Sequence, residues 1–182
     1  MDKYIKRSTL ENGNILVGLK YRFAQEYKRE DLFAVLNCLR DSTVWVPMTV
    51  MLSQRDQERV LDSVMKDGEI HVEPDQEWSN QDEIHMTADI LQDPDGALWF
   101  PIFSQQEQMP QEYMQNFSAI PMTVLDCIRM AHGMQQENQA LSDLQGIILD
   151  AFSDVNLPIP FDTADIIPEF PSRLDPNEED SE

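Results

Sequence analysis

Cys127 is the residue that most resembles a nucleophile with helper groups, because Asp126 precedes it and His132 follows five positions later. A thiol beside an imidazole base is an arrangement used for covalent catalysis. Five residues correspond to about 500° of rotation along an α-helix, so Cys127 and His132 would point in different directions. We therefore expect Cys127, like Cys38, to be a thiol of the hydrophobic core.

Metal binding is the second chemistry that the composition allows. The chain has three histidines: His71, His85 and His132. They show neither H-x-x-x-H nor H-E-x-x-H spacing, so we expect surface or capping histidines, and His132 suits the carboxyl end of a helix. Asp154, Asp162 and Asp165 are close in sequence but lack a calcium-loop pattern, and we interpret them as solvated acids. We expect no metal and no cofactor.

Residues 104–117 and an acidic stretch around Trp78 are better candidates for a binding surface than for a reaction centre. Flexible methionine side chains suit adaptable surfaces, although the ten methionines of the chain also fit plain core filling. An exposed tryptophan is a common interface anchor. The candidate partner surface comprises Trp78, Glu107, Met109, Tyr113, Met114 and Phe117.

The charge of the chain limits the kind of partner. Thirty-four acids against thirteen lysines and arginines give a formal net charge of −21, while the 41% hydrophobic content is ordinary for a globular protein. Such a field repels phosphate backbones and anionic lipids, so we expect neither nucleic-acid nor membrane-surface binding. The charge is compatible with a basic protein partner, and solubility is its simpler explanation.

The chain shows no targeting signal that we recognise. Charged residues near the N-terminus are not followed by a long apolar run, and no segment approaches the roughly 18 apolar residues of a membrane-spanning helix. The two cysteines do not form a C-x-x-C motif, as expected for reduced core thiols. These features predict a cytoplasmic protein.

The elements that would position these residues are clearest in the middle of the chain. Asp93–Gly96 has turn residues, and the apolar, aromatic run Ala97–Phe103 favours a buried strand. Ser104 and Glu107 form the S-x-x-E pattern of a capping box, which predicts a short helix. A strand or loop follows, and then a helical apolar stripe over Met122–Ala131.

Before this stretch, apolar residues at helical spacing predict a helix over Glu30–Leu39. Thr43–Val50 is β-branched and aromatic, and Pro47 removes one backbone donor, which predicts an edge strand or a bulge. Ile15–Tyr21 alternates like a strand, with a longer helix as the alternative. Three further elements are expected: an amphipathic helix over Ser53–Lys66, a loop over 69–83, and a strand over Ile84–Leu91 that forms a hairpin with Ala97–Phe103.

After the central stretch, the apolar run Gly146–Phe152 predicts a buried strand. Leu157–Phe161 contains two prolines, which cannot donate hydrogen bonds, so it can pair only as an edge strand. Residues 162–182 hold three more prolines and end in an acidic run, which predicts a tail disordered at its end. Helices alternate with strands, so we predict a single α+β domain with a mixed β-sheet covered by helices.

Three pieces of the chain follow one another in a familiar order: Leu32–Met48, Asp95–Ser104, and a helix followed by Gly146–Phe152. Together they resemble the SseB-like family, the N-terminal domain of the enhanced-serine-sensitivity protein B group, over roughly residues 30–160. The family's Pro-x-Phe-[Ser/Thr] sequence and the acid after it correspond to Pro101, Phe103, Ser104 and Glu107. Many members carry Asn-Pro where this chain has Asp150-Ala151. The resemblance implies a compact, bacterial, cytoplasmic α/β domain and supplies no catalytic residues.

These observations predict an SseB-like domain over residues 28–162, a partly ordered segment before it (1–27) and a Pro-rich acidic tail after it (163–182). We expect a non-catalytic cytoplasmic domain that binds a protein partner through an acidic, methionine-containing surface. One alternative is a small-molecule or metal-dependent enzyme or sensor built from scattered acids such as Asp89, Asp126 and Asp150. Another alternative is an immunity-type protein that neutralises a basic partner. The sequence does not indicate an oligomeric state.

Overall fold

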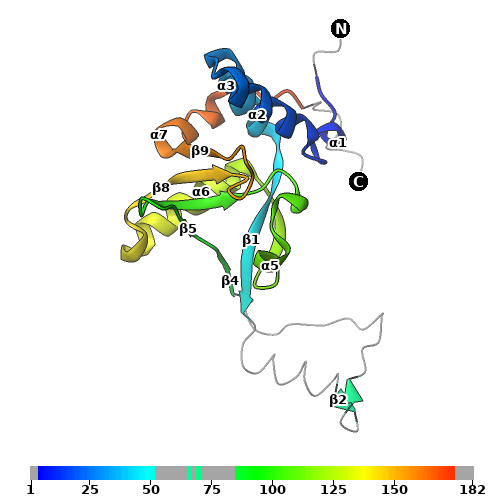
Figure 1. Ribbon diagram of the computed structural model, residues 1–182, viewed down its shortest axis with the longest axis vertical. Helices are drawn as coiled ribbons and strands as arrows, with labels where there is room; N and C mark the ends of the chain where they lie inside the picture. Colours follow the sequence, from blue (N-terminus) through cyan, green and yellow to red (C-terminus); the bar gives the residue numbers. More distant parts are fainter. Residues whose placement is uncertain (1–3, 52–64, 67–68, 71–84, 175–182) are drawn as a thin grey trace.

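The computed structural model describes residues 4–51, 65–66, 69–70 and 85–174. These residues form a single α+β domain, as predicted, in which two β-sheets meet at the long strand β1 (Figure 1). A separate pair of two-residue strands, β2 (Met65–Lys66) and β3 (Glu69–Ile70), pairs antiparallel. Most of the predicted helix Ser53–Lys66, most of the predicted loop 69–83 and Trp78 lie outside the described residues, and the last two residues of that helix form β2.

The first sheet has the strand order β4-β1-β7, with both neighbours antiparallel to the central strand. Its strands are β1 (Thr43–Met51), β4 (His85–Ala88) and β7 (Ser118–Thr123). The prediction that β1 is an edge strand or bulged at Pro47 is wrong, because Pro47 pairs with Ala119 in an unbroken register. The Pro47 carbonyl accepts from the Asp89 N–H (3.0 Å) on the other side. On this edge of β1, the pairing partner changes from Phe103 to β4 at Pro47. The proline nitrogen faces this change of partner, so the missing N–H costs no hydrogen bond between strands.

The second sheet is mixed, as predicted, with the order β5-β6-β8-β9 and a parallel pair at its centre. Its strands are β5 (Leu91–Gln92), β6 (Leu98–Ile102), β8 (Leu144–Leu149) and β9 (Leu157–Pro160). The buried central strands and the proline-containing edge strand confirm those predictions. The predicted hairpin is confirmed between β5 and β6, whereas His85–Ala88 pairs with β1 instead. Backbone bonds between Trp45 and Phe103 join the two sheets.

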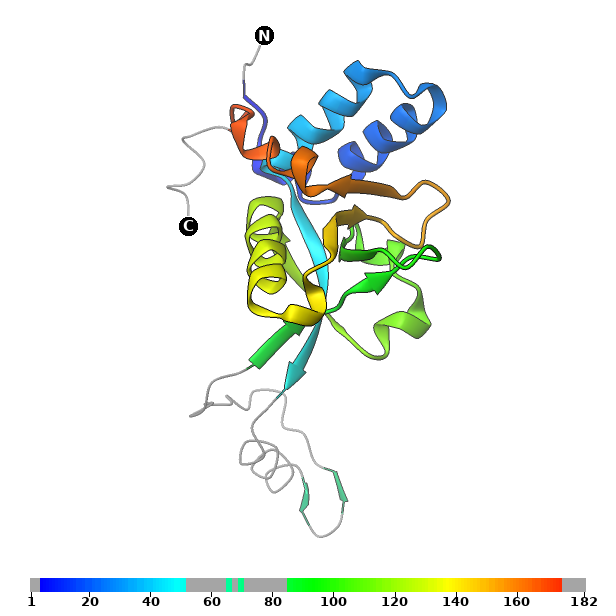
Figure 2. The same cartoon turned by 90° about the vertical axis from the view of Figure 1, so that its left-hand side faces the viewer.

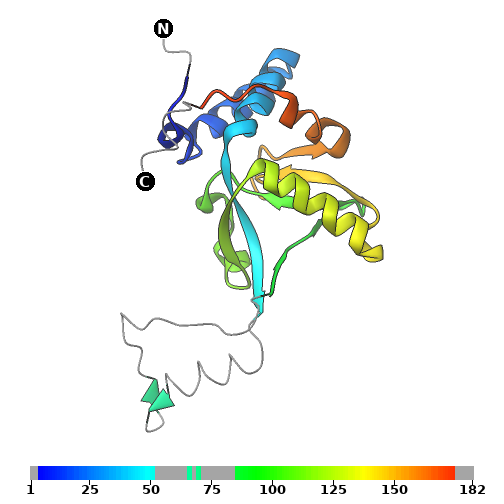
Figure 3. The same ribbon diagram turned by 180° about the vertical axis from the view of Figure 1, so that it is seen from behind.

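The helices lie on several sides of these sheets: α1 (Arg7–Leu10), α2 (Asn14–Glu26), α3 (Arg29–Asp41), α5 (Gln111–Met114), α6 (Val124–Glu137) and α7 (Phe161–Ala164). In Figure 2, α6 and α5 lie on opposite sides of β1, and Figure 3 shows α6 crossing the back of the sheets. Helix α6 begins at its N-cap Thr123, whose hydroxyl accepts from the Asp126 N–H (3.2 Å).

The expected strand over Ile15–Tyr21 is wrong, because these residues belong to helix α2. Alternation of apolar residues suggested a strand, but the buried positions are Leu16 and Lys20, which are four apart as on one helix face. Helix α3 confirms the helix predicted over Glu30–Leu39, and its acids near the start and Arg40 near the end complement the helix dipole.

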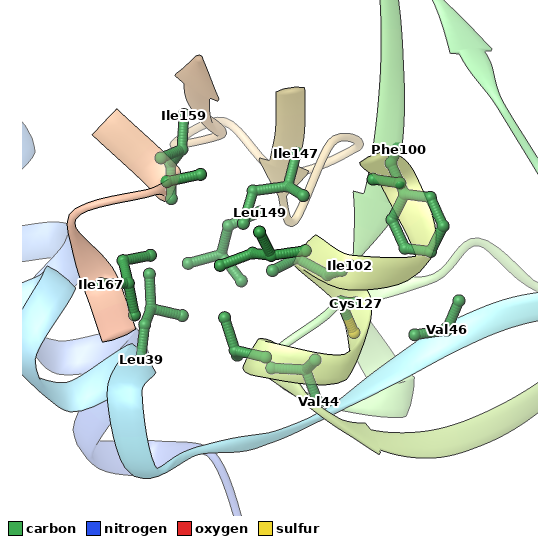
Figure 4. Close-up of a cluster of buried hydrophobic side chains, with 14 of the residues drawn as sticks. Leu39, Val44, Val46, Phe100, Ile102, Cys127, Ile147, Leu149, Ile159 and Ile167 are labelled. Carbon is green, nitrogen blue, oxygen red and sulfur yellow. The ribbon is translucent and has the colours of Figure 1, made fainter. Parts of the chain in front are cut away.

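The core lies between α6, α3, strand β1 and the second sheet. Side chains from these elements converge in Figure 4, where Leu39, Val44, Phe100, Cys127 and Ile147 are all fully buried. The chain continues into this core beyond residue 162, the predicted end of the domain. Ala164 and Ile167 are fully buried, and the Ile5 N–H donates to the Arg173 carbonyl (2.7 Å).

Candidate functional site

A buried polar network lies where β6 and β8 end. The Lys20 ammonium on α2 donates to the Asp150 carboxylate and to the Ser153 hydroxyl (3.2 Å). The Ser104 N–H and the Ser104 hydroxyl donate to the same carboxylate at 2.7 and 2.8 Å. The Asp150 carboxylate therefore connects helix α2, the segment that follows β6 and the turn after β8.

The backbone at Asp150 is adapted to this role. Asp150 has a φ of 53°, a left-handed conformation that aspartate and asparagine adopt more readily than most residues. Its N–H donates to the Ile102 carbonyl (2.9 Å), and its carbonyl accepts from the Ser153 N–H (2.9 Å). The chain therefore turns sharply after β8 and carries Phe152 at the tip of the turn.

The expected capping box at Ser104 is wrong. Ser104 is 1% exposed and its hydroxyl binds Asp150, while the following 3₁₀ turn Gln106–Gln108 has Gln105 at its N-cap position without a side-chain cap. The buried carboxylate of Asp150, at the end of the neighbouring strand β8, competes successfully for the hydroxyl because both of its oxygens need donors. Sequence spacing alone could not reveal that competitor.

The centre of the network, formed by Lys20, Asp150 and Ser104, is sealed from solvent, which decides its chemistry. The side chains of Lys20 and Asp150 are 1% and 0% exposed. A substrate cannot reach Ser104, Lys20 or Asp150 unless α2 separates from the turn after β8. We therefore assign the network a structural role, which is to hold the segment Phe103–Gln105 and the turn that carries Phe152.

An aromatic cluster lies on the outer side of this network, and we define it as Phe103, Tyr113, Phe117 and Phe152. Phe152 stacks on the buried Phe103 with ring centroids 5.9 Å apart, and Tyr113 lies 4.8 Å from both Phe117 and Phe152. Phe152 remains 45% exposed and Tyr113 and Phe117 are half-buried. The cluster is thus ordered by ring contacts and still offers apolar surface to a partner.

Tyr113 ties the cluster to the first sheet. Its hydroxyl donates to the Asp89 carboxylate (2.6 Å), in the segment after β4. Burial raises the pKa of the Tyr113 hydroxyl well above its usual value, and the hydrogen bond to the Asp89 carboxylate raises it further. Tyr113 is therefore a neutral donor. Its hydroxyl is held by Asp89 and its ring by contacts with Phe117 and Phe152.

The structure divides the predicted partner surface. Glu107 is exposed, and Tyr113, Met114 and Phe117 are half-buried around the short helix α5. Met109 is 5% exposed, so its assignment to the surface is wrong: the 3₁₀ turn reverses the chain and directs the thioether inward. The expected polar helix after the strand is only that turn followed by the four residues of α5.

Two important residues of this region were not predicted, Lys20 and Phe152, and Asp150 was named only among the scattered acids of the enzyme alternative. Lys20 shares a helix face with Leu16, and a lysine within an apolar stripe signals a buried partner once the segment is recognised as helical. Phe152 follows a short apolar strand and a residue suited to a left-handed turn, which places it at a tip. Its contacts with Tyr113 depend on tertiary structure alone.

The residues first considered for catalysis lie in separate environments. Cys127 is fully buried in the core, as expected, and its burial raises the pKa of the thiol well above the usual value. A ring nitrogen of His132 lies 2.8 Å from the Asp165 carboxylate, and the imidazole stacks on Phe161. Asp126 binds Thr123 and Arg129 at the start of α6. Among the described residues, no group of three or more His, Cys, Asp or Glu could hold a metal ion.

The fold and this site define a class: a small α+β domain with a sealed polar network beneath an exposed aromatic cluster. The family model for the SseB protein N-terminal domain matches residues 21–163, and the chain belongs to that family. The comparisons with curated proteins and with solved structures found no match. Within the described part of the chain, no helix has the length and apolar character needed to cross a membrane.

Proposed function

We propose that this chain is a non-catalytic protein-interaction domain and that it binds its partner through the aromatic cluster and helix α5. The observation that carries the proposal is Phe152, which is 45% exposed although the rings of Phe103 and Tyr113 hold it in place. An exposed aromatic side chain that is already ordered loses little conformational freedom on binding, which is typical of an interface anchor.

The surroundings of the cluster indicate the chemistry of the partner. Glu112 on α5 and Asp154 beyond Phe152 are exposed acids next to cluster residues in the chain, and Met114 contributes a half-buried thioether. A complementary partner would insert an apolar side chain between the rings and place basic residues around it. The net charge of −21 would increase the rate of association with such a partner.

Two further observations support a binding role rather than a reaction. The groups that resemble a nucleophile with its activators, Ser104 with Lys20 and Asp150, are sealed inside the fold. Cys127 is a buried thiol whose raised pKa disfavours the reactive thiolate. The SseB-like resemblance and the unpaired cysteines support a bacterial cytoplasmic location, which is part of the proposal.

Site-specific photo-crosslinking tests this function in cells of the source organism. A photoreactive phenylalanine analogue at position 152 should give one discrete heavier protein band, because that ring would enter the interface. The same analogue at position 166 is the control, since Ile166 is 43% exposed but belongs to a different surface. Equal adducts from both positions, or none from position 152, would refute the assignment of this surface.

Substitution of the anchor supplies the second half of the test. Phe152→Asp should reduce recovery of the crosslinked partner at least tenfold in co-purification, because a charge would replace the apolar anchor. Its melting temperature should fall by only about a few degrees, because the variant loses the ring contacts with Phe103 and Tyr113 at a position that is nearly half exposed. Unchanged recovery with Phe152→Asp would contradict the proposal.

A further inference from the structure

A recess, which we call the Trp45 cleft, lies beside the segment Phe103–Gln105. It has a volume of about 380 Å³ and is lined by Glu11, Asn12 and Asn14 at the start of α2, by Trp45 on β1 and by residues 105–107. Trp45 and Phe103 are bridge partners joined by two backbone hydrogen bonds of 2.8 and 2.9 Å. The cleft and the aromatic cluster are therefore built on the same short piece of chain.

The walls of the cleft are fixed by specific contacts. Gly13 has a φ of 68°, and a Cβ there would lie 2.1 Å from the Ser104 carbonyl oxygen, so only glycine allows the turn to approach this closely. The side-chain amide of Gln105 donates to the Asn12 carbonyl and to the Asn14 side chain, both at 2.8 Å. The buried network behind Ser104 holds the other wall. Such a preorganised recess lowers the cost of binding.

The chemistry of the lining points to a cation. The two charged residues in the lining are both acids, Glu11 and Glu107, and they are exposed to an approaching group. The amide donors of Gln105 are used inside the fold, so the group it still offers is a carbonyl oxygen. The half-buried Trp45 supplies an aromatic side chain, which attracts cations through its ring.

We propose that the Trp45 cleft binds the guanidinium group of an arginine of the partner protein; this inference rests on the proposed function. A guanidinium is planar, carries five donors and stacks on aromatic rings, so it can use carboxylates, amide oxygens and tryptophan together. A lysine ammonium has three donors around a compact charge and stacks less well on an aromatic ring. Anions are disfavoured by both glutamates and by the charge of the whole chain.

Nuclear magnetic resonance with a small probe tests the cleft without the partner. N-acetyl-arginine methylamide should shift the indole N–H signal of Trp45 in a saturable manner, with a Kd on the order of 1–10 mM for a single side chain. The citrulline analogue has nearly the same shape without the charge and should give no saturable shift. The lysine analogue should bind more weakly than the arginine probe. Trp45→Phe identifies the signal.

Charge variants locate the site. Glu107→Gln should weaken binding of the arginine probe about two- to fivefold, whereas Glu112→Gln, which removes an exposed acid on α5 outside the cleft, should leave it unchanged. Equal binding of the arginine and citrulline probes would overturn the proposal. So would a lysine probe as tight as arginine, or saturation by methyl glucoside instead of arginine. Failure here would leave crosslinking at position 152 as an independent test of protein binding.

Discussion

Lys20 and Asp150 form an ion pair with almost no access to water, and this isolation determines what each residue contributes. Removing two charges from water is costly, and the cost is offset here by direct contact and by the donors of Ser104 and Ser153. A pair of this kind contributes less net stability than its contact suggests. Loss of one partner, however, leaves an uncompensated buried charge, so each residue is strongly required while the other is present.

Substitution of Lys20 alone should therefore be severe. Lys20→Met keeps most of the side-chain volume but leaves the Asp150 carboxylate without its cation, and we expect a loss of about 3–5 kcal/mol in the free energy of unfolding. Urea unfolding followed by circular dichroism measures this loss. Hydrogen exchange should quicken in residues 150–153, whose turn the pair holds, before it quickens in α6.

The double variant Lys20→Met with Asp150→Asn is the matched control. Both charged residues are replaced, so no buried charge remains. Asparagine tolerates the φ of 53° and can still accept a hydrogen bond from the Ser104 N–H. Its stability should return to within about 1–2 kcal/mol of the unsubstituted protein, as found when buried ion pairs are replaced by well-packed neutral groups. If the two substitutions were simply additive, the pairing described here would be incorrect.

At the scale of elements, β8 and β9 approach closely because Gly146 has no side chain. A Cβ at Gly146 would lie 2.3 Å from the Ile159 carbonyl oxygen and 2.9 Å from the Phe161 nitrogen. Both obstacles are backbone atoms, so relief would require the whole edge strand to move. The prolines of β9 sit at alternate positions, which leaves Ile159 between them to face β8.

Alanine at two glycines should therefore have opposite effects. Gly146→Ala should displace β9 and reduce the free energy of unfolding by about 2 kcal/mol or more, because a backbone clash cannot be relieved by side-chain rotation. Gly18→Ala lies in helix α2, where an added Cβ meets nothing within 4 Å, and should stabilise by about 0.5–1 kcal/mol. Thermal unfolding of both variants checks the pair, and equal shifts would contradict the close approach of β8 and β9.

The elements most accurately predicted from sequence are those whose pattern agrees with their burial. The turn Asp93–Gly96 and the strands β6 and β8 carry turn residues and apolar runs that need no distant partner to be recognised. Helix α2 was only the alternative to a strand because Lys20 interrupts its buried face, and the burial of Lys20 depends on Asp150, 130 residues away. The edge strand or bulge predicted from Pro47 was wrong for a similar reason. A proline is accommodated inside the sheet because the strand partner of β1 changes at that residue, which sequence alone does not show.

At the scale of the molecule, the candidate site could be predicted only in part, because it is assembled from distant segments. Residues around α5 were anticipated from their composition, but Phe152, residues 11–14 and Trp45 join them only after the sheets have formed. The segment Phe103–Gln105 unites the aromatic cluster, the sealed network and the Trp45 cleft. A change that loosens Ser104 should therefore disturb both halves of the proposed binding surface together.

Closure of the chain is the other property of the whole molecule. Residues beyond the family match pack into the core: Ala164 and Ile167 are fully buried, and Phe170 contacts Phe33 at 6.1 Å between ring centroids. The backbone at Arg173 bonds to Ile5 and to the Asp41 carboxylate (2.7 Å each). Residues 164–174 therefore connect the N-terminal segment, α3 and the core.

A chain that ends at Thr163 should consequently be much less stable than one that ends at Leu174. Ile167→Ala alone should cost about 2–5 kcal/mol, because it opens a cavity in a fully buried site. The truncation should cost at least as much, since it also removes Ala164 and the contact of Phe170. Ile166→Ala is the control, because Ile166 is 43% exposed and its truncation should change stability by no more than about 0.5 kcal/mol. Calorimetric unfolding of the four proteins decides the matter: equal stability of the two chain lengths would mean that the matched family region is complete in itself.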